Sequence, residues 1–243
     1  MIRVTYIYHS GFCVETESSY YIFDYYKGEL PALNRQKPVY VFSSHFHEDH
    51  YNPKVFGLLK EQEIPLENIK AVLSSDIKRK RYPQGIEVLR VSADKSYTLA
   101  DGAIAETLHS TDSGVAYLLT AKDGVIYHAG DLNDWCWEEE SEEYNHNMTA
   151  RFRREIDRIA GRRIDVAFLP LDVRQEKDYA RGMLYFLEKA DVKCAYPMHY
   201  WGHPEVISQF CEEYLKYKEI VQNTEEAKEI SLYICEEKGN IKK

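Results

Sequence analysis

The six residues His45-Phe46-His47-Glu48-Asp49-His50 contain three histidines and one aspartate, and they directly follow an apolar run at residues 38–43. The apolar run is typical of a buried strand. Imidazole and carboxylate groups are the ligands that zinc and similar divalent ions prefer in proteins. A turn that leaves the strand can direct the first two histidines toward one metal ion, and the next turn can direct the aspartate and the last histidine toward a second. Two ions about 3.5–4 Å apart could then share one water or hydroxide.

Three further candidate ligands, His109, Asp131 and His199, each follow a predicted strand. Gly130 allows the backbone to turn tightly before Asp131, so that this carboxylate can face a site. Together the three residues supply an imidazole, a carboxylate and an imidazole, in the order that a binuclear site would use. The alternative, a solvated polar cluster that binds no metal, is disfavoured because these further candidates stand at strand ends.

Short strands dominate the first half of the chain, whereas strands and helices alternate in the second half. We predict strands over residues 2–8, 12–16, 20–24, 38–43, 70–73, 86–91, 96–99, 103–108, 114–120, 124–129, 164–169, 193–197 and near 231–235. We predict helices from Pro53 onward and over residues 148–160, 179–189 and 204–217. This order indicates sheets with helices packed outside them.

The full set of candidate ligands closely resembles the motif of the metallo-β-lactamase-fold hydrolases, in His45, His47, Asp49, His50, His109, Asp131 and His199. The resemblance covers residues 2–205 and implies an α/β fold, a four-layer αββα sandwich with its metal site at one edge between two sheets. We expect one such domain over residues 1–243. The resemblance implies one metal ion at His45, His47 and His109, a second at Asp49, His50 and His199, and Asp131 as the bridge.

The resemblance also predicts the cofactor and a branch of the family. It implies two divalent ions, with zinc expected and with manganese or a single ion as alternatives. His9-Ser10-Gly11-Phe12, residues 109–114 and residues 129–131 look like the branch that contains L-ascorbate-6-phosphate lactonase. We expect Asp49 and Asp131 to be catalytic as well as metal-binding.

Other residues near the predicted site have two interpretations each. A short turn after His199 could bring His203 to the pocket, where we assign it a catalytic role; the alternative is a place at a helix start. Arg174 could pair with an anionic substrate, or with Asp172. His9 could hydrogen-bond near the site, or serve only the hairpin that contains it.

Three more polar features are assigned from their sequence positions. Asp24 ends a predicted strand, and we expect it to orient a ligand histidine. His128 lies inside a strand, so we expect a core histidine there. Residues 134–147 combine two tryptophans with a run of glutamates. This segment is either a pocket wall or a solvated acidic loop that contains His146, and we favour the pocket wall for Trp135–Glu143.

Composition limits the range of partners. Among 243 residues, 31 Lys and Arg stand against 40 Asp and Glu, a net charge of −9 that gives no long-range attraction for nucleic acid or an anionic membrane. The five cysteines are scattered and include no Cys-x-x-Cys pair, which is typical of a reducing compartment. There is no signal-peptide pattern and no apolar stretch of about 20 residues. We therefore expect a cytoplasmic protein.

We expect a metal-dependent hydrolase that uses a metal-bound hydroxide on a small ester, lactone or phosphoester. A Gly-x-Ser-x-Gly motif, which would supply a separate nucleophile, is absent. One alternative is a nucleic-acid-processing phosphodiesterase of the same fold, which the acidic balance disfavours. Another is a non-catalytic metal-binding or redox protein; the resemblance disfavours it, because diiron members usually carry glutamate at the position of His47. The expected partner is a small-molecule substrate, with no nucleic acid and no membrane.

Overall fold

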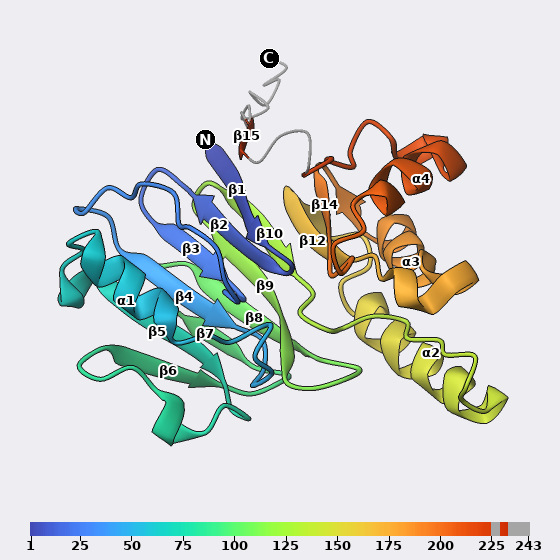
Figure 1. Ribbon diagram of the computed structural model, residues 1–243, viewed down its shortest axis with the longest axis horizontal. Helices are drawn as coiled ribbons and strands as arrows, with labels where there is room; N and C mark the ends of the chain where they lie inside the picture. The colour runs from blue at the N-terminus through green and yellow to red at the C-terminus, as the bar shows by residue number, and fades with distance from the viewer. Residues whose placement is uncertain (225–228, 233–243) are drawn as a thin grey trace, which may run out of the picture.

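The computed structural model describes residues 1–224 and 229–232. Two β-sheets face each other, and helices cover their outer sides (Figure 1). The first sheet has the strand order β15-β1-β2-β3-β4-β5-β6. Its strands are β1 Ile2–Tyr8, β2 Gly11–Glu15, β3 Tyr20–Phe23, β4 Val39–Ser43, β5 Ile69–Ser74, β6 Glu87–Val91 and β15 Glu229–Leu232.

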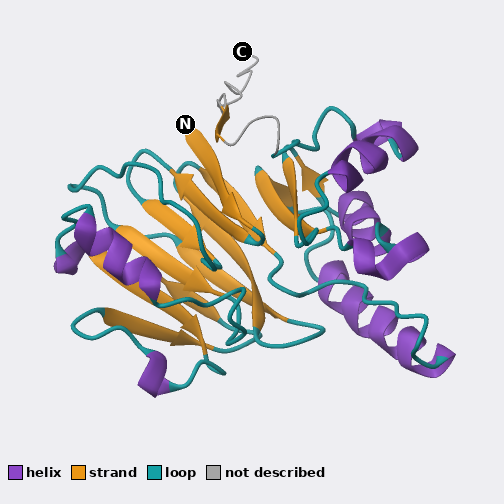
Figure 2. Ribbon diagram, viewed as in Figure 1, coloured by secondary structure: helices purple, strands orange, loops and turns teal. Residues whose placement is uncertain are grey.

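The second sheet has the strand order β14-β12-β10-β9-β8-β7. Its strands are β7 Ser96–Thr98, β8 Ile104–His109, β9 Val115–Ala121, β10 Gly124–His128, β12 Val166–Pro170 and β14 Ala195–Met198. A short pair, β11 Arg163–Ile164 and β13 Asp191–Val192, forms a separate two-stranded ladder. The helices are α1 Lys54–Glu61, α2 Glu142–Asp157, α3 Arg181–Lys189 and α4 Glu205–Glu213 (Figure 2).

Strand direction in the first sheet sets where the histidine cluster emerges. β3, β4 and β5 run parallel, with Phe23 paired to Phe42. β4 is buried along its whole length, as expected for a parallel strand that is covered on both faces. The carboxyl ends of β3 and β4 therefore lie side by side, and Asp24 emerges next to Ser44, at the start of the histidine cluster.

The second sheet places three more polar residues in the same way. β10, β12 and β14 run parallel, with His128 paired to Phe168 and Pro170 paired to Met198. Asp131, Asp172 and His199 follow the carboxyl ends of these three strands. A backbone hydrogen bond of 3.0 Å from Val115 N to Ser44 O joins the two sheets close to this edge.

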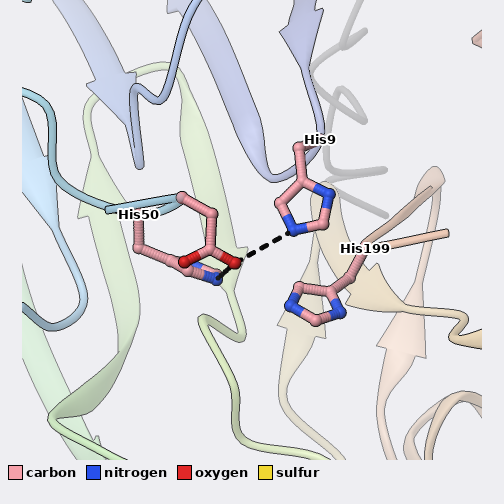
Figure 3. A group of neighbouring side chains, drawn as sticks. His9, His50 and His199 are labelled. Atoms are coloured by element: carbon pink, nitrogen blue, oxygen red, sulfur yellow. Dashed lines mark ion pairs between the residues drawn. The ribbon is translucent and has the colours of Figure 1, made fainter. Parts of the chain in front are cut away.

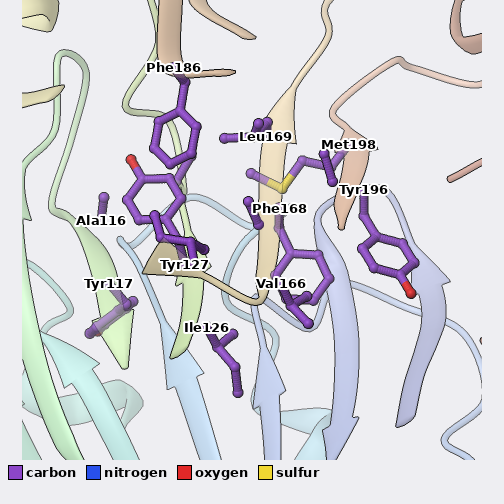
Figure 4. Packing of buried hydrophobic residues seen from close by; sticks show 14 of the residues in the cluster. Ala116, Tyr117, Ile126, Tyr127, Val166, Phe168, Leu169, Phe186, Tyr196 and Met198 are labelled. Carbon is purple, nitrogen blue, oxygen red and sulfur yellow. The ribbon is translucent and has the colours of Figure 1, made fainter. Parts of the chain in front are cut away.

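Aromatic side chains fill the space between the sheets (Figure 4). Phe12 of β2 stacks on Phe168 of β12, with ring centroids 4.1 Å apart. On the outer face of the second sheet, Phe186 of α3 packs on Tyr127 of β10, with ring centroids 4.5 Å apart. On the opposite side of the molecule, Val55, Phe56 and Leu59 of α1 pack in a second buried cluster with the outer face of the first sheet. This order of layers confirms the expected αββα sandwich.

The acidic segment folds differently from the prediction. α2 begins at Glu142 rather than near residue 148, so the second part of the expected acidic loop is helical. Ser141 caps the helix, because its Oγ accepts a hydrogen bond of 3.1 Å from Tyr144 N. Glu142 and Glu143 occupy the first turn, where carboxylates are favourable near the positive end of the helix dipole. The glutamates that suggested a loop thus help to start a helix.

The remaining boundaries agree with the predicted ones to within a few residues, with one exception and one open case. α4 ends at Glu213, and a separate 3₁₀ turn, Leu215–Tyr217, continues the chain. The last predicted strand overlaps β15, but residues 233–235 lie outside the described residues. No helix in the described part of the chain is both long enough and apolar enough to cross a membrane. One domain over residues 1–243 stays a prediction.

Candidate metal centre

Eight side chains gather into two adjacent groups at the edge where the two sheets meet. The first group consists of His45, His47, Asp112 and Asp131, and the second group consists of His9, Asp49, His50 and His199. Within each group, one ligand atom from every residue lies within 4.8 Å of the others. Each group therefore has the composition and the spacing that a divalent metal ion requires.

Asp131 lies between the two groups. Its Oδ2 is 3.4 Å from His45 Nε2 in the first group. Its Oδ1 is 3.2 Å from His50 Nε2 and 3.5 Å from His199 Nε2 in the second group. One carboxylate thus reaches both positions with separate oxygens, which is the geometry that a bridging ligand needs.

The second group is assembled from segments that are distant in the sequence (Figure 3). His9 lies in the turn between β1 and β2, His50 follows β4, and His199 follows β14. Asp49 Oδ2 lies 3.4 Å from His9 Nε2 and 3.7 Å from His50 Nε2. The β1–β2 turn, the end of β4 and the end of β14 therefore contribute to one small site.

The buried carboxylate of Asp24 orients two of the histidines. It accepts hydrogen bonds from His50 Nδ1 at 2.7 Å and from Ser44 Oγ at 2.6 Å. Ser44 Oγ in turn lies 2.9 Å from His45 Nδ1. With Nδ1 engaged in both rings, the Nε2 atoms of His45 and His50 face Asp131. Asp24 has the orienting position that the sequence predicted for it.

Asp172 has the same relation to His199. Its Oδ2 lies 2.9 Å from His199 Nδ1, which leaves Nε2 directed at Asp131. The same carboxylate accepts hydrogen bonds from Nε and Nη2 of Arg174. Carboxylates that hold the outer nitrogen of a ligand histidine fix the ring and raise its basicity.

The charges in the site favour a cation at its centre. Burial, together with the neighbouring His50, lowers the pKa of His45 to about 4. Burial also disfavours a charged His50, but the carboxylates of Asp131 and Asp24 outweigh it and raise the pKa of this imidazole to about 9. Burial alone would raise the pKa of Asp24, yet the nearby histidines, with His128 and His50 foremost, lower it to about 2. A divalent ion would supply positive charge to balance the carboxylates of Asp131 and Asp24.

Three buried ligand atoms have no hydrogen-bond partner among the described residues: His9 Nε2, His50 Nε2 and Asp131 Oδ1. A buried polar atom without a partner costs about 1–3 kcal/mol. All three atoms belong to side chains of the two groups and face other ligand atoms at 3.2–3.7 Å. The residues present therefore fit a metal ion, because coordination would satisfy the three atoms together.

The backbone is strained at this edge. His9, Asp24 and His199 have φ values of 57°, 41° and 64°, a left-handed region that residues other than glycine rarely adopt. Such strain is concentrated at functional sites, where the surrounding structure holds it in place. Gly130 has φ 51°, and a Cβ there would stand 2.6 Å from Ser44 Cβ. Only glycine allows the loop of Asp131 to pass so close to the histidine cluster.

The structure brings together most of the ligands predicted from the sequence. His45, His47, Asp49, His50, Asp131 and His199 all lie in the two groups. His109, which was expected at the first metal ion, lies outside both groups: it is exposed, and its Nδ1 is 2.8 Å from Ser110 O. It is the last residue of β8, and side chains alternate between the faces of a strand. By this alternation His109 shares a face with the buried Ala105 and Thr107, but it stands at the end of the strand, where its side chain is exposed.

The structure also does not bring His203, expected to be catalytic, into either group. His203 is exposed at the start of α4, and its Nδ1 lies 3.0 Å from Glu205 Oε1. The helix-start position, which was the alternative, is the one observed. His128 is a fully buried core histidine as expected; its Nε2 lies 2.9 Å from Ser10 O and its Nδ1 accepts from Gly130 N.

Two members of the groups, His9 and Asp112, were not predicted as ligands. Asp112 Oδ2 lies 3.9 Å from His47 Nδ1, on the side of the first group where His109 was expected. A signal for Asp112 was available, since it is the only carboxylate in the loop that precedes Gly114. His9 is 5% exposed and packs on His199, with ring centroids 4.4 Å apart.

A cavity of about 220 Å³ opens beside the two groups, and Asp131, His199, Trp135, Trp137 and Arg174 help to line it. Trp135 is buried, and its Nε1 donates a hydrogen bond of 3.0 Å to Asp131 O. The two indoles stack with centroids 5.7 Å apart. The tryptophans of the segment after Asp131 thus form part of a pocket wall, as predicted.

Comparison with known proteins identifies the fold. No protein-family model and no curated protein sequence matches the chain. Among solved structures, Igni18, a novel metallo hydrolase from Ignicoccus hospitalis, superimposes with a TM-score of 0.64 at 16% identity, over 96% of this chain and 99% of that one. YhfI from Bacillus subtilis, a metallo-β-lactamase fold protein, superimposes with a TM-score of 0.50 at 12% identity, over 82% and 86% of the two chains. The chain has the metallo-β-lactamase fold.

The metallo-β-lactamase fold supports more than one chemistry. CmlA from Streptomyces venezuelae, a diiron β-hydroxylase, also superimposes on this chain, with a TM-score of 0.63 at 11% identity. The match covers 96% of this chain and 54% of CmlA. At these identities the likeness concerns the fold, so the reaction must be argued from the side chains of the site. The likeness to the lactonase branch stays a prediction.

Proposed function

We propose that the chain is a metal-dependent hydrolase of small esters, lactones or phosphoesters. The observation that carries this proposal is the convergence of His9 Nε2, His50 Nε2 and Asp131 Oδ1, which are buried and without hydrogen-bond partners among the described residues. The first group would hold one divalent ion and the second group another, with Asp131 shared between them. Neutral imidazoles and carboxylates suit zinc, and manganese is also compatible with the carboxylates of the first group.

The chemistry follows from where these side chains stand. A divalent ion lowers the pKa of its water toward neutrality and polarises an oxygen that gains charge. Asp24 and Asp172 keep the outer nitrogens of the ligand histidines engaged, so the inner nitrogens stay available. Asp49 is partly exposed, with 22% of its side chain accessible, and against the effect of burial His9 and His50 keep its pKa low, so it can bind at the second group as a carboxylate. Asp131 would bridge the two proposed metal positions.

A second candidate function is oxidative chemistry at two iron ions. Asp112 favours it, because it makes the first group two histidines and two carboxylates, a set that also suits iron. The fold of CmlA shows that a diiron enzyme can have this architecture. Dioxygen uptake by the iron-loaded protein, with a reductant present, separates this candidate from hydrolysis.

The test is hydrolysis by protein of known metal content. Protein purified without added metal is analysed for its ions, stripped with a chelator, and reloaded separately with zinc, manganese or iron. Each form is assayed on a panel of lactones, carboxylic esters, thioesters and phosphodiesters. We expect turnover of at least one small substrate that disappears on stripping and returns on reloading. His50→Ala should abolish turnover, while the exposed His146→Ala should not. Turnover that is unaffected by stripping, or none on any substrate with both groups loaded, contradicts the proposal.

A further inference from the structure

The cavity beside the two groups has one cationic side chain in its lining. Its lining contains Asp131 and His199 from the groups, the apolar surfaces of Trp137 and Tyr144, and the guanidinium of Arg174. A ligand in this cavity would therefore touch the proposed metal positions and Arg174 at the same time. The inference below rests on the proposed function and concerns the substrate of that same site.

Arg174 is held in a fixed orientation. Its Nε donates to Asp172 Oδ1 at 2.9 Å, and its Nη2 donates to Asp172 Oδ2. The guanidinium carbon lies 4.7 Å from the ring centroid of Trp201 and 5.8 Å from that of Trp137. A guanidinium that is bound to a carboxylate and placed over aromatic rings loses little further conformational freedom when it binds a ligand.

Arg174 keeps donor capacity for a ligand. Its three side-chain hydrogen bonds to Asp172 use only Nε and Nη2, and Nη1 makes no hydrogen bond within the described part of the chain. The Arg174 side chain is 49% exposed. Asp172 is itself shared with His199 Nδ1, so Arg174 and the second group are positioned by one carboxylate. A guanidinium favours oxyanions, which accept its hydrogen bonds with charge assistance.

The rest of the cavity lining combines aromatic and apolar side chains with Thr111 and Asp112. Tyr144 and Trp201 are 41% and 43% exposed, unusually open for large aromatic residues, and they stand beside the cavity or against Arg174. Met148 adds apolar lining from α2. The volume of about 220 Å³ corresponds to roughly seven water molecules and lies below the usual range for drug-sized ligands. A small organic molecule fits this volume.

We propose that Arg174 binds the oxyanionic group of a small organic substrate, while Trp137 and Tyr144 contact its apolar body and the two groups act on its scissile bond. The anionic group is a carboxylate or a phosphate-like group, which share the same recognition chemistry. In this account Arg174 selects the substrate, and its pairing with Asp172 fixes the orientation in which the guanidinium meets the ligand.

The experiment measures ligand binding, without turnover, to the full-length, metal-loaded protein. Benzoate, phenylphosphonate and the neutral benzamide are titrated by calorimetry and by indole fluorescence. We expect at least one anion to bind about tenfold or more tighter than benzamide. The tighter of benzoate and phenylphosphonate identifies the anion as carboxylate or phosphate-like. Equal binding of all three probes overturns the proposal.

Arg174→Met tests whether the preference comes from the guanidinium, and Arg163→Met is its matched control. Arg163 is 50% exposed and pairs with Asp165 two residues away, as Arg174 pairs with Asp172, but it stands at the opposite end of β12. Arg174→Met should lower the ratio of anion to benzamide affinity about tenfold, and Arg174→Lys should retain part of it. Arg163→Met should keep the wild-type ratio. A preference that survives in Arg174→Met places the anion on the metal ions and overturns the proposal.

The metal content of every sample is measured beside the titrations. Absence of hydrolysis with an intact anion preference contradicts the proposed function alone, while hydrolysis without the preference contradicts only the role of Arg174. Thermal unfolding of each variant, followed by circular dichroism, shows that the binding change occurs in folded protein.

Discussion

Nδ1 of His50 lies 2.7 Å from Oδ2 of Asp24, and both side chains are completely buried. The same carboxylate reaches His45 through Ser44 Oγ, so it orients one histidine of each group. Asp24 follows β3 and the histidines follow β4, and the parallel pairing of these strands sets the distance between them. The site is thus built on the rigid edge of a sheet.

We expect Asp24→Asn to weaken metal binding about 10- to 100-fold, because His50 Nδ1 loses a charged acceptor, and so does Ser44 Oγ, which holds His45 Nδ1. Asp101→Asn is the matched control. Asp101 also accepts two short hydrogen bonds, from Ser19 Oγ and Tyr21 Oη at 2.6 Å each, but it lies at the turn between β7 and β8. Competition with a chromophoric chelator measures both affinities. Equal metal affinity in the two variants would mean that Asp24 serves folding only.

Substitutions of Asp112 and His109 are expected to have different effects on metal affinity. Asp112→Ala should lower the affinity of the first group at least about tenfold, since a ligand lost from a site of four leaves an open position. His109→Ala should leave metal content and affinity unchanged, because the imidazole is exposed and outside both groups. Titration of each chelated variant with zinc, read by calorimetry, compares them. The reverse pattern would restore His109 as the ligand.

His9 is expected to bind at the second group. Its Nε2 is buried without a partner among the described residues and lies 3.4 Å from Asp49 Oδ2. His9→Ala should weaken one of the two ions about tenfold or more and leave the other unchanged. His203→Ala, on the exposed start of α4, should match the wild type. Equilibrium dialysis resolves two binding steps, and loss of neither step in His9→Ala would rule out this role.

Stability is expected to fall in mild acid because of His128. Burial lowers the pKa of His128 below its ordinary value of 6.5. Below that value the unfolded chain binds a proton that the folded protein excludes, so stability is present above about pH 6.5 and is lost as the pH falls, by at most about 1.4 kcal/mol per unit for this group. His128→Gln removes this contribution, because glutamine does not bind a proton in this pH range.

Urea unfolding of metal-free protein at about pH 7.5 and about pH 5.5 measures this effect. The loss of stability between the two conditions should be smaller in His128→Gln than in the wild type. His146→Gln, an exposed substitution on α2, should show the wild-type loss. A loss in His128→Gln equal to that of the wild type would assign the acid sensitivity to other groups.

Local sequence patterns were enough to predict the parts of the site that depend on strand ends. The six-residue histidine cluster, Asp131 and His199 each leave a parallel strand at its carboxyl end, and parallel pairing carries all of them to one edge. Asp24 was predictable for the same reason. The strand-rich first half and the alternating second half predicted sheets with helices outside them, and the resemblance to the metallo-β-lactamase-fold hydrolases implied the four-layer αββα order.

The residues whose positions differ from the predicted ones depend on details that a local pattern does not contain. Whether His109 faces in or out depends on where β8 ends, and the strand runs one residue beyond the predicted end. The contribution of His9 depends on the contact between the β1–β2 turn and His199, 190 positions later in the chain, with backbone atoms 3.5 Å apart. The start of α2 depends on a serine cap within an acidic run. Tertiary contacts and single-residue boundaries decided these cases.

The central claim is that the two groups form one binuclear metal centre joined by Asp131. It is tested most directly by the metal content per chain, from elemental analysis after loading and removal of free ions, in the wild type and in Asp131→Ala. Because the carboxylate oxygens of Asp131 reach both groups and offset the repulsion between two dications, we predict about two ions in the wild type and at most about one in the variant. Two tightly held ions in Asp131→Ala, or none in the wild type, would contradict the account.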